Sequence, residues 1–197
     1  MQLYGTVTSP FVRRVRVVAH ELGVEVRMID TATPAGQDAL RAVSPVGKVP
    51  VAQFDGATVF DSHAIVAEMV AQRGSGPLRI GGRTDPAESN FVVAVDAALE
   101  AAIRLFYFQR DGVAIEGLPY MVKERARVRT IMTWLEGQVH GTSVTRDPGF
   151  GLAELALVTT LDWMEFRGAY PTGDHPRLLA VRAAHASRAS LRATLPG

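Results

Sequence analysis

The first third of the chain alternates short apolar runs with amphipathic segments, a pattern typical of a small α/β unit. Between two apolar runs, Phe11, Val15, Val18 and Leu22 recur at helical spacing. Asp-Gly at positions 55–56 separates two further runs and predicts a hairpin turn. In order, the predicted elements are strand 1–5, helix 10–22, strand 24–29, helix 35–43, strands 51–54 and 58–60, and helix 62–73. The predicted order is therefore βαβαββα.

The helix predicted over residues 10–22 has recognisable ends. Ser9 suits the N-cap, and Pro10 suits the first helical position, where its missing N–H costs nothing. Gly23 ends the helix. Arg13, Arg14 and Arg16 fall mostly on the side opposite the apolar residues. We therefore expect these three arginines to lie away from the buried face.

The second half of the chain has helical periodicity throughout. The predicted helices cover 87–109, 118–139, 151–167 and 176–186, followed by a short tail at 187–194. The helix at 151–167 is the most apolar, and such a helix, buried on most sides, forms the centre of a domain. Gly- and Pro-rich segments interrupt the pattern between the halves. We therefore predict an α/β domain at 1–76, a linker at 77–86 and an all-helical domain at 87–197.

The composition excludes several classes of function. The chain has 197 residues, a net charge of +1 and no basic stripe, so nucleic acid is not an expected partner. It has no cysteine, which excludes disulfides, zinc–thiolate sites and a protein thiol nucleophile. A thiol that reacts here must therefore arrive with a ligand. No signal peptide and no apolar run of about 20 residues is present, so we expect a cytoplasmic protein without a membrane segment.

Ser9 has two possible roles. It can serve only as the helix N-cap, or its hydroxyl can donate to an anion held beside the free backbone N–H groups of the helix. A thiolate placed there is favoured over its thiol, so its pKa falls. Thr8 is the alternative hydroxyl. His20 lies about 16 Å along the helix axis, too far to act as a base for Ser9, so no catalytic triad is predicted.

Two other short segments carry candidate chemistry. Val49-Pro50 precedes an apolar strand and is either an ordinary trans edge proline or a cis bond. A cis bond would turn the Val49 backbone outward and leave its N–H and C=O free for a ligand. Asp61-Ser62 opens the helix at 62–73. Either residue can be a simple cap, or the pair can hold a ligand carboxylate on Ser62 and an amine on Asp61.

Taken together, these features resemble the N-terminal domain of cytosolic glutathione S-transferases. The features are the βαβαββα order, the Ser-Pro pair at 9–10, the Val-Pro pair at 49–50 and the Asp-Ser pair at 61–62. The resemblance continues through the helical second half. It is closest to bacterial members that contain Ser-Pro-Phe-Val-Arg, as residues 9–13 do. It implies a thioredoxin-like α/β domain followed by an all-α domain.

The resemblance also assigns roles to residues. It implies that Val49-Pro50 is cis and that the Val49 backbone pairs with the cysteinyl unit of glutathione. Asp61 and Ser62 would hold the γ-glutamyl end, and Ser9 would hydrogen-bond the glutathione sulfur. Lys48 matches a position that often approaches the glycyl carboxylate, and Phe11 is a further candidate for glutathione binding.

The family's central helix usually begins Ser/Thr-x-x-Asp, a capping box. Here Gly151 and Glu154 occupy those positions. Glycine at an N-cap costs only a few tenths of a kcal/mol relative to Ser or Thr, so we expect the helix to form regardless. The departure affects a structural motif and leaves the chemistry untouched.

In the family, the apolar co-substrate lies near the first long helix and the central helix. The candidates here are Phe11, Phe106, Tyr107, Arg110 and Trp163. Consecutive aromatics cannot all face one way on a helix, so at least one of those at 106–108 should be exposed or line a cleft. Packing or a dimer contact is the alternative role for them.

The resemblance implies a glutathione transferase that passes the glutathione thiolate to an electrophilic apolar molecule. Glutathione is the only expected cofactor, acting as co-substrate, with no metal, and the expected assembly is a homodimer. Three alternatives stay open: another glutathione-dependent enzyme such as an isomerase or dehalogenase, a disulfide reductase that uses two glutathiones, and a non-catalytic ligand-binding protein. The absence of cysteine argues against family branches that form a mixed disulfide with glutathione.

Overall fold

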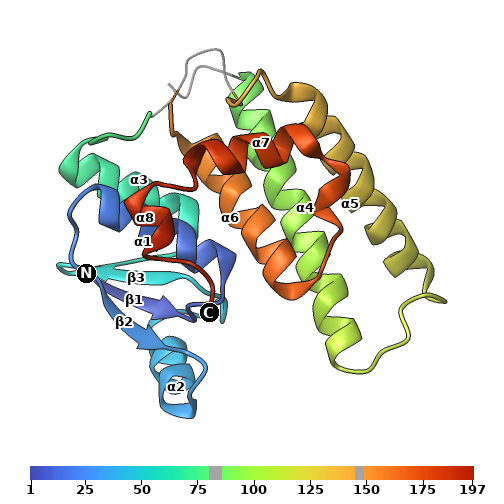
Figure 1. Cartoon of the computed structure of the whole chain (residues 1–197). Coiled ribbons are helices and arrows are strands. Elements are labelled where there is room, and N and C mark those ends of the chain that lie inside the picture. The colour runs from blue at the N-terminus through green and yellow to red at the C-terminus, as the bar shows by residue number, and fades with distance from the viewer. Residues whose placement is uncertain (80–85, 145–148) are drawn as a thin grey trace. The chain divides into compact units, whose positions relative to one another are not determined.

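A computed structural model describes residues 1–79, 86–144 and 149–197 (Figure 1). The described chain forms two compact units, one made of residues 1–78 and 187–197 and the other of residues 79–186. The predicted linker at 77–86 lies mostly outside the described residues, since 80–85 are not among them. No helix in the described ranges is long and apolar enough to cross a membrane.

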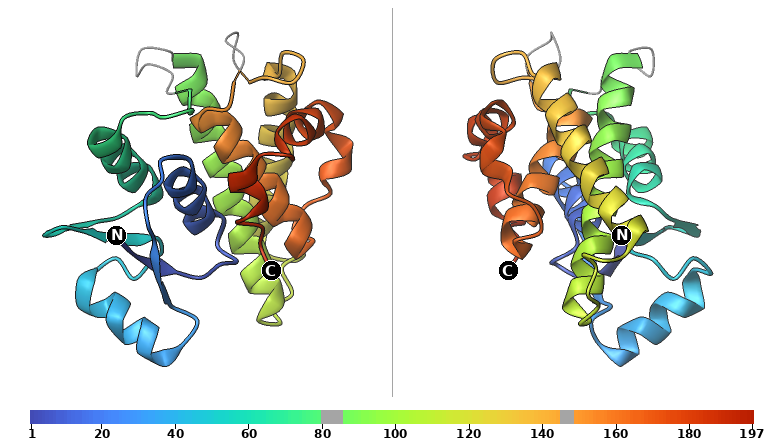
Figure 2. Two further views of the ribbon diagram at one scale, coloured as in Figure 1. Left: turned by 60° about the vertical axis from the view of Figure 1, so that its left-hand side comes forward. Right: turned by 90° about the vertical axis from the view of Figure 1, so that its right-hand side faces the viewer.

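The first unit is built on a four-stranded mixed sheet. Its elements are β1 (Gln2–Gly5), α1 (Pro10–Glu21), β2 (Arg27–Asp30), α2 (Pro34–Val43), β3 (Val51–Phe54), β4 (Ala57–Val59), α3 (Ser62–Arg73) and α8 (Ala189–Arg192). The strand order is β2-β1-β3-β4, with β1 parallel to β2 and antiparallel to β3. α1 and α3 cover one face and α2 part of the other (Figures 1 and 2). The predicted thioredoxin-like order is confirmed, with its hairpin at residues 55–56.

Side-chain caps start three helices of this unit. Ser9 Oγ accepts from Val12 N (3.3 Å) at α1, and Thr33 Oγ1 accepts from Gly36 N (3.1 Å) at α2. Asp61 caps α3 through Oδ1. Each cap satisfies one or two backbone N–H groups that the helix itself leaves without a partner. Because Ser9 and Asp61 are caps, they hold fixed places at the starts of α1 and α3.

The prediction for Arg13 and Arg14 is wrong, because both side chains are buried, at 2% and 3% exposure. Residues 187–197 return to the first unit, and α8 packs against α1. Arg13 Nη2 donates to the Leu191 carbonyl (3.2 Å) and its Nε to Thr194 Oγ1 (3.4 Å). The side of α1 away from the sheet is therefore covered by a segment far along the chain.

The same tail is held at the C-terminal end of α1. Arg188 Nε donates to Glu21 Oε1 at 2.6 Å, and the Ser190 hydroxyl donates to the same oxygen. Burial alone would raise the pKa of Glu21, but the hydrogen bonds from Arg188 and Ser190 outweigh it and lower the pKa below the usual value. The tail is thus joined to α1 at both ends of the helix.

The second unit is helical. Its elements are α4 (Pro86–Arg110), α5 (Pro119–Gln138), α6 (Leu152–Arg167), a short 3-10 helix η1 (Thr172–Asp174) and α7 (Pro176–His185). α4 packs against α5 and α6, and α7 against α6 and α5. α6 is buried nearly all round, from Ala153 to Met164 with few interruptions. The predicted centre of the helical part is confirmed, whereas η1 was not predicted.

The start of α6 is held by a buried ionic network. Glu154 is fully buried and accepts from Gly151 N (2.9 Å), Val144 N (3.1 Å) and Arg79 Nη2 (2.9 Å). Glu88 takes two further bonds from Arg79 (3.0 and 3.1 Å). Burial would lower the pKa of Arg79, but these bonds and the two carboxylates raise it. The bond from Gly151 N to Glu154 is therefore the one half of the family's capping box that this chain keeps.

Gly151 is needed for a reason that the sequence did not suggest. A Cβ at this position would lie 2.5 Å from the Arg79 carbonyl oxygen and 2.7 Å from Arg79 Nη2. Real Cβ atoms essentially never approach other atoms so closely, so the Arg79 segment occupies the space that a Ser or Thr side chain would need. Glycine here accommodates the arginine.

Candidate functional site

Ser9 lies half-buried at the N-terminus of α1, as predicted. Its oxygen accepts from Val12 N, and its backbone carbonyl accepts from Arg13 N (2.9 Å). A hydroxyl that accepts this cap bond still has its hydrogen to donate. Thr8, the alternative, lies 3.3 Å from Thr6 through their hydroxyl oxygens. Ser9 can therefore hydrogen-bond an anion while it caps the helix.

Val49-Pro50 is a cis peptide bond, as predicted, and it directly precedes β3. Pro50 is buried and Val49 half-buried. Within the described part of the chain, Val49 forms no hydrogen bond through its N–H or its C=O. Two backbone groups beside the end of a strand are thus available to an extended ligand.

A small apolar cluster packs against Val49. Tyr4, Leu40 and Val51 form its buried part, and Val49 packs against them. Leu40 comes from α2, whose C-cap is Ser44. The Ser44 side chain accepts from Val46 N (3.3 Å). This cluster was not predicted from the sequence. The apolar positions of the helix predicted at 35–43 were the only indication of it.

Asp61 and Ser62 have different roles at the start of α3. Asp61 is exposed, and its Oδ1 accepts from His63 N (2.9 Å) and Ala64 N (3.2 Å). Ser62 is only 3% exposed, and its hydroxyl makes no hydrogen bond with any described residue. Its oxygen is not one of the fully buried, unpartnered side-chain atoms among the described residues, so it reaches the surface and can bond to a ligand or water. Ser62 is therefore a candidate group for binding a ligand at the N-terminus of α3.

The remaining candidates of the first unit lie near these groups in sequence. Lys48 is exposed, and no described residue pairs with it. Phe11 is half-buried on the first turn of α1, with the Arg14 guanidinium 5.0 Å from its ring centre. No hydrogen bond among the described residues joins the side chain of Lys48 to Ser9, Val49 or Ser62.

The co-substrate candidates of the second unit divide into two groups. Phe106 on α4 and Trp163 on α6 are brought together edge to face, with ring centres 5.7 Å apart. Tyr107 is 45% exposed, and Arg110 stacks over its ring at 4.6 Å while pairing with Asp111. The predicted exposure of at least one aromatic in the 106–108 run is confirmed.

No group of three or more His, Asp or Glu side chains that could hold a metal ion occurs among residues 1–79, 86–144 and 149–197. The candidate groups of the first unit are hydroxyls, backbone groups and two helix N-termini, which are groups that can bind an anion.

The first unit matches a known domain family. Residues 3–77 match the model of the glutathione S-transferase N-terminal domain. Over its whole length the chain is 27% identical to the uncharacterised GST-like protein YibF of Escherichia coli (strain K12), covering 98% of that protein. Residues 3–77 thus form a glutathione S-transferase N-terminal domain.

Solved structures share the fold of the whole chain. A glutathione S-transferase from Methylobacillus flagellatus with glutathione bound has a TM-score of 0.84 at 24% identity, covering 100% of this chain and 99% of that one. A maleylacetoacetate isomerase from Methylobacterium extorquens AM1, with malonate and glutathione bound, has a TM-score of 0.77 at 20% identity and covers 100% and 96%. At these identities the structures establish the fold.

Proposed function

We propose that this chain is a glutathione transferase, which binds glutathione in its first unit and transfers the thiol to an electrophilic apolar molecule. The observation that carries the proposal is Ser62 at the start of α3, a residue only 3% exposed whose hydroxyl has no hydrogen-bond partner among the described residues. The free backbone groups of Val49 and the proton of Ser9 are further groups available to a ligand. All three residues fall within the part of the chain that matches the family model. Glutathione bound in the M. flagellatus relative supports this choice of ligand.

Each part of glutathione has a complementary group in the proposed site. The γ-glutamyl carboxylate accepts from the Ser62 hydroxyl and the α3 N-terminus, and Asp61 attracts the γ-glutamyl ammonium. The backbone of Val49, ahead of cis Pro50, pairs with the cysteinyl N–H and C=O as a short extended segment. Lys48, exposed and free, attracts the glycyl carboxylate.

The N-terminus of α1 activates the thiol in this proposal. The cysteinyl sulfur lies at Ser9, whose hydroxyl donates to the thiolate, while the helix end stabilises its charge. A free thiol has a pKa of about 8.5, and each unit of lowering corresponds to about 1.4 kcal/mol. The thiolate then attacks an electrophilic carbon of the second substrate. Phe11 lies in the same first turn of α1 and completes the glutathione site.

The second substrate is apolar in this proposal, and Phe106 with Trp163 is the aromatic pair best suited to contact it. Tyr107 and Arg110 are more exposed candidates for the same role. The proposed protein is a cytoplasmic homodimer, and light scattering of the purified chain tests the dimer directly. A monomer mass at micromolar concentration would contradict it.

An isomerase that uses glutathione without consuming it is the second candidate function. The glutathione-bound maleylacetoacetate isomerase with the same fold supports it. The two functions differ in whether free thiol disappears as product forms. Thiol titration during turnover of aryl halides and of cis-unsaturated diacids therefore separates conjugation from isomerisation.

Calorimetric titration of glutathione tests the proposed site. Wild type should bind one glutathione per chain, and Ser62→Ala should weaken binding about tenfold or more, because a hydrogen bond to a charged group is lost. Ser89→Ala, which removes an exposed hydroxyl from the first turn of α4, is the matched control and should change nothing. Absence of saturable binding at millimolar glutathione would refute the proposal.

A second titration tests the role of Ser9. Ser9→Ala should raise the pKa of bound glutathione, measured by thiolate absorbance against pH, and slow conjugation to an aryl halide. Thr33→Ala removes the equivalent cap bond from α2 and controls for the loss of a helix cap. If both variants behave alike, the Ser9 hydroxyl only caps the helix.

A further inference from the structure

One face of the sheet in the first unit is only half covered. Tyr4 and Val51 pack there against Leu40 of α2. Side chains two residues apart on a strand share a face, so Gln2 of β1 and Gln53 of β3 lie on this same face, next to the covered part. On this face, the side chains change from apolar to polar over two residues of each strand, from Tyr4 to Gln2 on β1 and from Val51 to Gln53 on β3.

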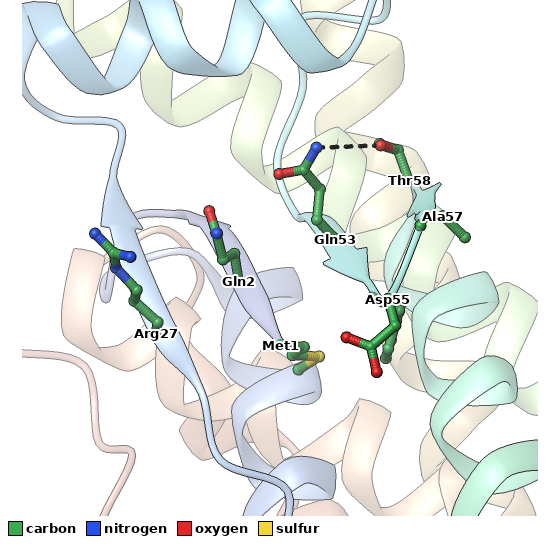
Figure 3. Close-up of a pocket in the computed structure, with 9 residues that line it drawn as sticks. Met1, Gln2, Arg27, Gln53, Asp55, Ala57 and Thr58 are labelled. Atoms are coloured by element: carbon green, nitrogen blue, oxygen red, sulfur yellow. Dashed lines mark hydrogen bonds between the residues drawn. The ribbon is translucent and has the colours of Figure 1, made fainter.

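The polar half is a continuous row across the sheet. Gln2 pairs with Arg27 of β2 and with Gln53 of β3, and Gln53 pairs with Thr58 of β4. We name these four residues the polar row. They line a hollow of about 570 Å³ together with Met1, Phe54, Asp55, Gly56 and Ala57 (Figure 3). None of the candidate glutathione-site residues lines this hollow.

Hydrogen bonds hold part of the polar row in place. The Tyr4 hydroxyl donates to Gln53 Oε1 (2.8 Å). Gln53 Nε2 donates to Thr58 Oγ1 (3.4 Å), as Figure 3 shows. The Gln53 amide therefore has a fixed orientation. The side chains of Gln2 and Arg27, by contrast, make no hydrogen bond with another described residue. An amide and a guanidinium are left available beside a fixed amide.

Opposite charges stand at the two ends of the hollow. Arg27 lies on the edge strand β2, and Asp55 lies in the β3–β4 turn. Neither forms an ion pair among the residues that the structure describes. Neighbouring strands are about 4.8 Å apart, so the Cα of Arg27 is about 10 Å from that of Gln53. Asp55 lies two residues, about 7 Å, beyond Gln53, so the Cα atoms of Arg27 and Asp55 are about 12 Å apart. At this separation they can bind the two ends of one ligand.

We propose that this hollow binds a short zwitterionic peptide of about three residues. A chain of three residues spans about 10 Å, and the lengths of the Arg27 and Asp55 side chains make up the rest of the distance between their Cα atoms. The peptide carboxylate binds Arg27 and the Gln2 amide, its ammonium binds Asp55, and its backbone hydrogen-bonds Gln53 and Thr58. Because both charged side chains are exposed, salt weakens the binding.

Titration of triglycine into the full-length, ¹⁵N-labelled protein tests this site. The side-chain amide signals of Gln2 and Gln53 should shift and saturate. Arg27→Gln and Asp55→Asn should each weaken binding about threefold to fivefold, as expected for exposed charge pairs. Both residues are on the surface, so the variants should fold. Arg73→Gln, an exposed arginine at the end of α3, is the matched control and should not change the affinity.

Blocked peptides test the charge assignment. N-acetyl-triglycine and triglycine amide should each bind as weakly to wild type as triglycine binds to the variant that lacks the matching charge. Equal binding of blocked and free peptides would overturn the proposal, as would the absence of saturable shifts at Gln2 and Gln53. Shifts confined to residues around Ser62 would also overturn it, because triglycine would then occupy the glutathione site.

Discussion

Replacing Gly151 by alanine should destabilise the protein, although the backbone there suits any residue. Its φ is −118°, so no left-handed strain is involved. The new Cβ would instead lie 2.5 Å from the Arg79 carbonyl oxygen and 3.0 Å from its guanidinium carbon. Inserting a methyl group into a filled site costs about 1–3 kcal/mol. Arg79 must move, and its bonds to Glu88 and Glu154 lengthen as it does.

The matched control is the same substitution in α5. Gly137 has open space around its Cβ position, with no heavy atom within 4 Å. Alanine in a helix interior is favoured over glycine by about 0.5–1 kcal/mol, so Gly137→Ala should stabilise the protein. The same chemical change therefore has opposite signs at the two positions.

Urea denaturation followed by circular dichroism and by tryptophan fluorescence measures both variants. For a chain of this size, 1 kcal/mol corresponds to about 2–4 °C in Tm, so thermal melts give an independent check. Gly151→Ser should also be less stable than wild type, although serine is the better N-cap in general. If Gly151→Ala or Gly151→Ser is as stable as wild type, Arg79 does not limit the space at this helix start.

Two further predictions concern helix ends. Glu136 of α5 caps α7 by accepting from Arg177 N (2.8 Å) and Leu178 N (3.0 Å), so Glu136→Ala should cost about 1–2 kcal/mol in urea denaturation, and an unchanged midpoint would refute the cap. The lowered pKa of Glu21 means that its bonds to Arg188 stabilise the fold above the unfolded pKa, near 4.5, and are lost as pH falls through the folded pKa. Glu21→Gln should therefore be less stable than wild type at neutral pH, with a difference that shrinks on acidification below 4.5; a constant difference would contradict this linkage.

The elements and much of the proposed site could be predicted because their signals are local. Ser9 with Pro10 marks the start of α1 through residues next to each other in the chain, and the bounds Val51–Phe54 and Ser62–Arg73 follow from short runs with clear ends. The cis bond at Val49 was predicted from family resemblance rather than from local physics. The free Ser62 hydroxyl could be recognised only from the structure, since burial depends on the whole unit.

Two misjudged features depend on residues far apart in the chain. Arg13 has a buried side chain because Thr194, 181 residues later, covers it, and no periodicity within α1 contains that information. From the sequence, Gly151 was expected to be a harmless replacement of the Ser or Thr in the family's capping box. Its real constraint is the Arg79 backbone, which only the fold brings beside it.

The return of residues 187–197 to the first unit has a consequence for biosynthesis. The ribosome makes the glutathione S-transferase N-terminal domain before the second unit, but the segment that covers α1 follows that unit. At about 5–20 residues per second, synthesis of the intervening second unit takes on the order of 10 s. During that time the face of α1 that carries Arg13 lacks its final cover. The nascent first unit therefore completes its packing only after the second unit has been made.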